Sequence, residues 1–170
     1  MRQLVQNIIE RKLNNYFEFY RDYDNPIKHL KNQTNSVPNC SGLYLVFSKK
    51  KSFEISEHLN FEIENEIKEL LYFGKAGGIT KKGKVIKQGL NGRINNVVSD
   101  SHRNLKDIKR ANYWNVVMND NDFDKLTIIY FIDDNPQEIE DVIYSFLDER
   151  NLRYPLMNKK RGRKTSHRSV

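Results

Sequence analysis

Short runs of β-branched and aromatic residues, broken by turn-forming segments, constrain the fold of this chain most. Residues 42–48 (Gly-Leu-Tyr-Leu-Val-Phe-Ser) and 126–132 (Leu-Thr-Ile-Ile-Tyr-Phe-Ile) have the length and composition of strands. Similar patterns predict strands at 70–74 and 113–118. The Asn- and Asp-rich segment 119–124 is predicted to be a turn between the last two strands. A chain with several such strands is expected to form a sheet.

Apolar residues at helical spacing lie between these runs. They predict an amphipathic helix over 2–22, a second over 57–69 and a third from Leu90 onward. A fourth helix is predicted to start at 134–136, where a capping residue precedes a proline, and to end near Pro155. The apolar face of the fourth helix is predicted to consist of Ile139, Val142, Ile143, Phe146 and Leu147.

These elements place the chain in the α+β class. We expect a small domain with a mostly antiparallel central sheet flanked by helices, an added N-terminal helix and a basic C-terminal tail. The chain is divided into residues 1–40 (helical extension and connector), 41–158 (main domain) and 159–170 (tail).

Positive charge is concentrated in the tail. The chain has a net charge of +7, and six of these charges lie in residues 159–170, which contain no acid, leaving +1 for residues 1–158. A basic segment beside a nearly neutral body indicates a polyanionic partner. A solvated tail that only aids solubility is the alternative.

Several classes of protein are excluded or disfavoured. No stretch approaches the roughly 18 apolar residues of a membrane span, and the first residues lack the apolar segment of a secretion signal. The single cysteine, Cys40, excludes an internal disulfide and a cysteine-based zinc site. The four histidines lack ligand spacing, and the glycines at 74–78 lack the spacing of a phosphate loop or a dinucleotide motif. A cytoplasmic location is expected.

Two tyrosine motifs suggest an activity. Gly42-Leu43-Tyr44 lies in the first predicted strand and Tyr72-Phe73-Gly74 in a later one, followed by Arg93 in a helix, an acidic helix and Pro155-Leu-Met-Asn158. In this order, the motifs resemble the GIY-YIG nuclease family over about residues 42–158. Only the apolar middle residue of each triplet differs from the family motif.

The chain also departs from that family in two places. The segment between the two tyrosine motifs is longer than in the compact family core, which we interpret as an inserted helix near 57–69. Val97 stands where family members often carry a histidine, so no histidine base is expected.

The resemblance implies a role for each matching residue. Tyr44 and Tyr72 would project from adjacent strands into one cleft, and one of them would help to deprotonate the attacking water. A tyrosine is a poor base unless nearby cations lower its pKa. Lys82 is the expected assisting lysine, and Lys75 and Lys84 are expected to bind DNA. The alternatives are core aromatics for the tyrosines and a solvated or phosphate-binding residue for Lys82.

Charge stabilisation is implied for two further residues. Arg93 would stabilise the transition-state charge on the phosphate, the alternative being a surface arginine. Glu140 would hold one Mg²⁺ per active site, with Mn²⁺ as a substitute, because Mg²⁺ often takes only one or two carboxylates. Glu138 and Glu149 remain alternatives for the metal. Asn158 would close the site or fix its geometry.

The resemblance therefore implies a Mg²⁺-dependent endonuclease that hydrolyses phosphodiester bonds in double-stranded DNA. The chain is most similar to the standalone type II restriction endonucleases of the family, and a palindromic target would call for a homodimer. A structure-specific DNA repair or recombination nuclease and a noncatalytic nucleic-acid-binding module are the alternatives. RNA as the substrate also stays open.

The tail is expected to add affinity for DNA. Arg161-Gly162-Arg163 between lysines is similar to the core of an AT-hook, but Lys164 replaces the usual proline. We expect sequence-independent phosphate contacts instead. The residues expected to make them are Lys159, Lys160, Arg161, Arg163 and Lys164.

Overall fold

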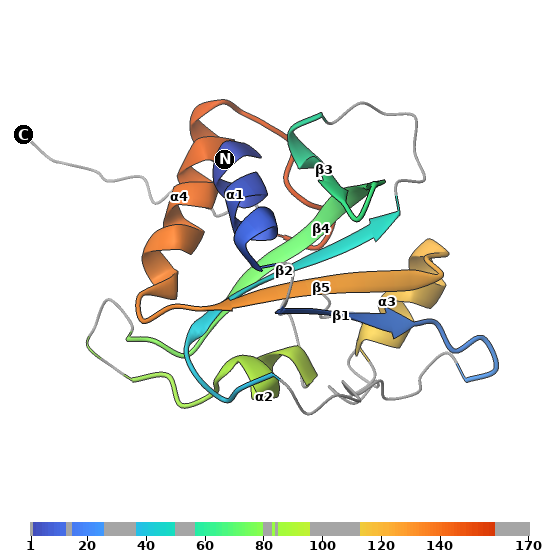
Figure 1. The fold of residues 1–170 in the computed structure, drawn as a ribbon, viewed down its shortest axis with the longest axis horizontal. Coiled ribbons are helices and arrows are strands. Elements are labelled where there is room, and N and C mark those ends of the chain that lie inside the picture. Colours follow the sequence, from blue (N-terminus) through green and yellow to red (C-terminus); the bar gives the residue numbers. More distant parts are fainter. Residues whose placement is uncertain are drawn as a thin grey trace, which may run out of the picture.

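A five-stranded sheet forms the centre of the described part of the molecule (Figure 1). The computed structural model describes residues 2–12, 15–25, 37–49, 57–79, 83, 85–95 and 113–158. The strands are β1 (Tyr16–Tyr20), β2 (Gly42–Lys49), β3 (Asn60–Ile63), β4 (Glu66–Ala76) and β5 (Lys125–Ile132). Their order in the sheet is β1-β5-β2-β4-β3, and each of these pairings is antiparallel. The predicted α+β class is confirmed.

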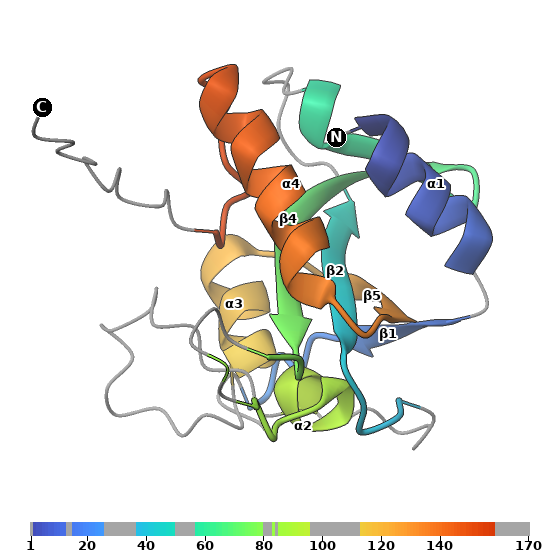
Figure 2. The same ribbon diagram turned by 90° about the vertical axis from the view of Figure 1, so that its left-hand side faces the viewer.

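Helices cover both faces of the sheet (Figures 1 and 2). The helices α1 (Arg2–Lys12) and α4 (Pro136–Glu149) pack on one face, while α2 (Leu90–Asn95) and α3 (Tyr113–Asn121) pack on the other. Each face buries its own apolar cluster: Leu43, Leu45 and Phe73 lie on the α1/α4 side. Tyr44 and Val46 lie on the α2/α3 side, because successive residues of a strand point to opposite faces.

The helix predicted over 2–22 is too long. Helix α1 ends at Lys12, and residues 16–20 form β1, which pairs with β5 at the edge of the sheet. Phe17 and Phe19 are buried, while Tyr16, Glu18 and Tyr20 are partly or largely exposed. This alternation is the pattern of a strand with one buried face.

The helix predicted over 57–69 is wrong. The segment is a short 3₁₀ turn, η2 (Glu57–Leu59), followed by β3 and the start of β4, which form a β-hairpin. Its two-residue turn consists of Glu64 and Asn65, with φ angles of 53° and 63°. Two successive positive φ values match the twist of the flanking strands. The insertion between the tyrosine motifs is thus a hairpin.

The strand predicted at 113–118 is also wrong, since this segment begins α3, and that helix continues to Asn121 into the predicted turn. Trp114, Val117 and Met118 are buried on one side of the helix at positions i, i+3 and i+4. The strand position beside β5 that this segment would need is occupied by β1.

The remaining predicted elements are confirmed. Strands form at 42–49 and 125–132, the strand predicted at 70–74 extends over 66–76, and α4 starts at Pro136. The predicted apolar face of α4 needs one correction. Ile143 and Leu147 are buried, but Val142 is 54% exposed and points away from the sheet.

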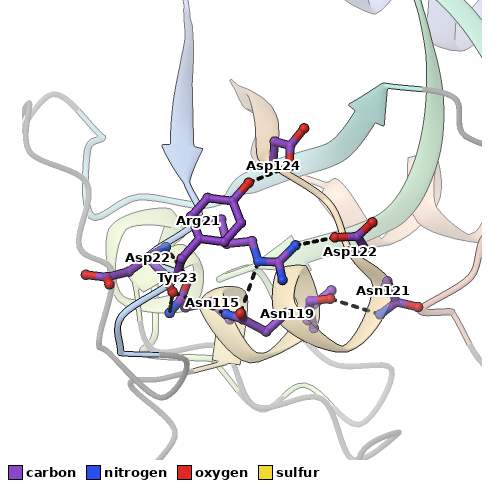
Figure 3. A network of polar contacts seen from close by, with 9 residues as sticks. Arg21, Asp22, Tyr23, Asn115, Asn119, Asn121, Asp122 and Asp124 are labelled. Atoms are coloured by element: carbon purple, nitrogen blue, oxygen red, sulfur yellow. Dashed lines mark hydrogen bonds and ion pairs between the residues drawn. The ribbon is translucent and has the colours of Figure 1, made fainter.

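A polar network holds the segment after β1 to α3 (Figure 3). The buried Asn115 side chain accepts a hydrogen bond from the Asp22 backbone N–H at 2.8 Å and donates one to the Asn25 carbonyl at 2.7 Å. Arg21 donates to the side chains of Asn119 and Asp122. These contacts order a segment without regular structure, because its backbone groups find partners on the helix.

The sheet curls strongly at the end opposite the C-terminus of β4. Tyr16 of β1 donates a hydrogen bond of 2.6 Å to Glu64 of the hairpin turn, although β1 and β3 are opposite edge strands. The ammonium group of Lys68 is buried inside this curl, 2.9 Å from the Thr127 hydroxyl and 3.7 Å from a Glu18 carboxylate oxygen. The buried charge is therefore paired and hydrogen-bonded.

Candidate functional site

A small pocket lies beside the C-terminal end of β4, where α2 and the first turns of α4 approach the strand. Its volume is about 150 Å³. It is lined by Tyr72, Lys75 and Ala76 of β4, Ile86 and Gln88 of the loop before α2, Arg93 of α2 and Glu140 of α4. Four of the residues singled out from the sequence, Tyr72, Lys75, Arg93 and Glu140, thus line one pocket.

The two motif tyrosines lie side by side on one face of the sheet. Tyr44 is opposite Gly74 in the β2–β4 ladder, and Tyr72 is two residues before Gly74, so the two tyrosines are diagonal neighbours. Their ring centroids are 5.6 Å apart with the planes at 39°. Tyr44 is fully buried and does not line the pocket, whereas Tyr72 does. Only one tyrosine therefore faces the pocket directly.

Each motif glycine allows a close approach. A Cβ on Gly74 would lie 2.5 Å from Cε1 of the Tyr72 ring, so the ring lies over Gly74 in space that a side chain would fill. A Cβ on Gly42 would lie 2.2 Å from the Phe131 carbonyl oxygen and 2.6 Å from Cδ1 of Leu90. Gly42 thereby lets α2, which carries Arg93, sit against the start of β2.

A β-bulge sets the direction of Tyr72. Val46 pairs with Tyr72, but the next residue, Phe47, pairs with Leu70, so Leu71 is an extra residue on β4. Such a bulge bends the strand and changes which face its side chains occupy. Leu71 and Tyr72 consequently both contact the α2/α3 cluster, where strict alternation would have sent one of them to the other face.

Burial dominates the ionisation of Tyr72. Loss of solvent raises the pKa of Tyr72 above its ordinary value of 10.0, while the Tyr44 hydroxyl and the charge of Arg93 act in the opposite direction. The nearby Glu140 carboxylate raises the pKa further. Among the described residues, the cation that lowers the pKa of Tyr72 is Arg93; Lys82 and Lys84, two of the lysines expected to supply the cationic field, lie outside the described part of the chain. Tyr72 is accordingly a neutral phenol at neutral pH.

One buried donor of Arg93 has no acceptor in the described part of the chain. Its Nε atom is buried and has no hydrogen-bond partner among the described residues. A buried donor left unsatisfied costs about 1–3 kcal/mol, so an acceptor from a bound ligand would recover that loss. A guanidinium fork matches the geometry of phosphate oxygens. The pocket is therefore suited to bind an oxyanion at Arg93.

Lys75 is held against α4. Its ammonium donates a hydrogen bond to Oε1 of Gln137, and Nε2 of Gln137 donates to the Asp141 carboxylate at 2.8 Å. Gln137 is the second residue of α4 and lies one turn before Glu140. Sequence reasoning missed Gln137, Gln88 and Ile86, since no motif or spacing distinguishes them from ordinary surface residues.

Asn158 supports the site from outside the pocket. Its side chain accepts a hydrogen bond from the Phe73 N–H at 3.0 Å and donates to the Phe73 carbonyl at 2.9 Å and to the Tyr144 hydroxyl at 3.1 Å. The Met157 N–H also donates to the Leu71 carbonyl at 2.9 Å. The segment thus pairs with β4 on both sides of Tyr72, much as a further strand would.

Among the described residues, the carboxylate that lines the pocket and could contribute to a metal site is that of Glu140. Glu140 lines it, whereas Glu138 and Glu149 are exposed elsewhere on α4 and do not. Among the described residues, no group of three or more His, Cys, Asp or Glu side chains could hold a metal by itself. A single hard oxygen donor fits Mg²⁺, which commonly keeps several waters and takes further ligands from a phosphate. A single carboxylate does not suit a metal ion whose ligands all come from the protein.

Part of the predicted site cannot be located. The residues in question lie outside the described part of the chain: Lys82, Lys84, Lys159, Lys160, Arg161, Arg163 and Lys164.

Comparisons with protein-family models, curated proteins and solved structures gave no significant match. Within the described residues, no helix is both long and apolar enough to cross a membrane.

Proposed function

We propose that this chain is a Mg²⁺-dependent endonuclease of the GIY-YIG type that hydrolyses phosphodiester bonds in double-stranded DNA. The observation that carries the proposal is the convergence of Tyr72, Lys75, Arg93 and Glu140 on one small pocket from three elements. They combine a proton-transfer group, two cations for an oxyanion and a carboxylate for a hard cation.

The size of the pocket favours a phosphate over a larger ligand. At about 150 Å³ it is well below the roughly 300–1,000 Å³ of pockets that enclose small molecules. A phosphodiester group could enter it while sugar and base stay outside. Sequence recognition would then rest on other surfaces, since phosphate contacts carry no base information.

Arg93 and Tyr72 would share the chemistry. The guanidinium would bind the phosphate oxygens and oppose the charge that builds up as water attacks phosphorus. Tyr72, neutral at rest, would orient the attacking water through its hydroxyl. It would accept the proton of that water only as the tyrosinate, after releasing its own phenol proton to solvent, and the positive charge of Arg93 favours this ionised form. Tyr44 would assist Tyr72 from outside the pocket, because its hydroxyl acts to lower the pKa of Tyr72.

Glu140 would hold one Mg²⁺ ion per site, for which Mn²⁺ can substitute. When bound, the ion supplies charge compensation for the phosphate and the leaving oxygen. Asn158 would act indirectly, by fixing the backbone of β4 at Phe73, the neighbour of Tyr72. A sequence-specific type II restriction endonuclease, acting as a homodimer in the cytoplasm, is the form of this function that we propose.

Cleavage of unmethylated plasmid and phage DNA tests the proposal. Purified protein is incubated with each DNA in Mg²⁺ or EDTA, beside the variants Arg93→Ala and Glu140→Gln. Glu138→Gln serves as the matched control, because it removes the same charge from an exposed position two residues away on α4. Discrete Mg²⁺-dependent fragments from wild type and E138Q, absent with R93A and E140Q, would support a restriction endonuclease.

Other results assign the protein differently. Cleavage of branched DNA alone would replace the restriction role with repair or recombination. Binding of DNA without cleavage of any substrate would leave a noncatalytic binding module, and equal cleavage by R93A would overturn the assigned site.

A further inference from the structure

Gln137 connects Lys75 in the wall of the pocket to Asp141 of α4, and the mechanism above assigns no role to these two contacts. Its carboxamide oxygen accepts from the ammonium of Lys75, and its carboxamide nitrogen donates to the carboxylate of Asp141. The orientation of the amide is unambiguous, because a lysine ammonium can only donate and an ionised carboxylate can only accept. The oxygen and the nitrogen of the Gln137 carboxamide therefore each have a hydrogen-bond partner.

The position of Gln137 relates this contact to the candidate site. It lies on the first turn of α4, three residues before Glu140, and hence on the same side of the helix. Lys75 and Glu140 both line the pocket, and Lys75 comes from β4, 62 residues away in the chain from Gln137. The hydrogen bond thus fixes a flexible lysine against the wall of the pocket.

A glutamine can order Lys75 without neutralising its charge, which neither glutamate nor alanine would do at this position. It orders the lysine with one of the three ammonium donors and, being uncharged, does not itself neutralise the positive charge of Lys75. A glutamate at this position would neutralise that charge and would also face the Asp141 carboxylate. An alanine would leave Lys75 free to sample other rotamers, at an entropic cost when a ligand binds.

We propose that Gln137 is a positioning residue that holds Lys75 as a phosphate-binding cation in the pocket. This inference rests on the proposed function, because it assigns DNA phosphate as the ligand of Lys75. Lys75 contributes affinity through one phosphate contact, and Gln137 contributes only through Lys75.

The test measures binding of a fluorescently labelled DNA duplex by anisotropy over a series of salt concentrations. All measurements are made in EDTA, so the result does not depend on whether the chain cleaves DNA. The variants are Lys75→Ala, Lys75→Arg, Gln137→Ala, Gln137→Glu and the double variant K75A/Q137A. Lys49→Ala is the matched control, because Lys49 is an exposed lysine at the far end of β2.

The expected results separate charge from packing. K75A lowers affinity by about tenfold, as expected for one charge-assisted hydrogen bond, and reduces the slope of log K against log[salt] by about 0.9. Q137E reduces the slope by a similar amount, whereas K75R retains it. Q137A weakens binding in the wild-type background but causes no further loss in K75A.

Three outcomes would overturn the proposal. These are an unchanged salt slope in K75A, a slope loss equal to that of K49A, and additive losses for K75A and Q137A. Circular dichroism melting of each variant identifies any that are unfolded, and the folded K75R and Q137E still decide the question. Cleavage by the wild type together with an unchanged slope in K75A would refute this inference but not the proposed function.

Discussion

Replacing Gly74 by alanine should disable the site by moving one ring. The added Cβ would lie 2.5 Å from Cε1, 2.7 Å from the hydroxyl oxygen and 2.9 Å from Cζ of Tyr72. Carbon atoms in ordinary contact are about 3.5–4.0 Å apart, so the ring must move by roughly 1 Å or more. Displacement of a catalytic group by about 1 Å costs on the order of a hundredfold in rate.

The fold should survive this substitution. Crowding a packed site costs about 1–3 kcal/mol, and Gly74, although buried, lies beside the ring of Tyr72, which lines a pocket into which it can turn. We therefore expect a lower melting temperature with an unchanged circular dichroism spectrum at 25 °C. Loss of cleavage rate without loss of fold would distinguish a displaced catalytic group from a destabilised sheet.

Single-turnover cleavage of a plasmid by G74A, Tyr72→Phe and the double variant provides the assay. If G74A acts by displacing the Tyr72 hydroxyl, the double variant should cleave at nearly the rate of Y72F, because residues that share one function are not additive. The reasoning is refuted if folded G74A cleaves at the wild-type rate. A further hundredfold loss on adding G74A to Y72F would equally contradict it.

Two further predictions concern stability. Asn158→Ala removes both hydrogen bonds to the Phe73 backbone, so we expect a loss of about 2–4 kcal/mol in the free energy of unfolding, measured by urea denaturation; a loss below about 1 kcal/mol would contradict the supporting role. For Glu18, burial opposes ionisation, but hydrogen bonds from Tyr20 and Lys125 outweigh it and lower the pKa below the ordinary 4.5. Its ionised form therefore stabilises the fold above about pH 4.5, and the advantage over Glu18→Gln should shrink as pH falls through and below that value. Denaturation of both proteins between pH 3 and 7 measures this, and a constant difference would refute it.

Sequence reasoning located the central strands because their composition leaves little choice. Strands β2 and β5 are dense in β-branched and aromatic residues and are buried on both faces. The hairpin was misread because Leu59, Ile63 and Ile67 are four residues apart, a spacing that fits one face of a helix and one face of a strand equally. Phe61 distinguishes the strand from the helix, because it is buried in β3, whereas in a helix it would lie on the side opposite Leu59 and Ile63.

The candidate site was predictable only in part. Tyr72, Arg93 and Glu140 were identified through the order of motifs and converge on the pocket. The burial of Tyr44 and the bulge at Leu71 depend on the pairing register of two strands, which a single sequence does not reveal. Gln137 had no signal at all, because its role is defined by a lysine from a strand distant in the chain.

The pairing of Asn158 with β4 has a consequence for how long DNA would stay bound. Asn158 directly precedes the basic tail, and it is anchored to Phe73, the neighbour of Tyr72. Lys164 follows six residues later, so the chain can carry it no more than roughly 20 Å from that anchor. Five cations are thereby tethered within a few base pairs of the pocket. A duplex released by the pocket but still held by the proposed tail contacts would rebind in an intramolecular step at high effective concentration.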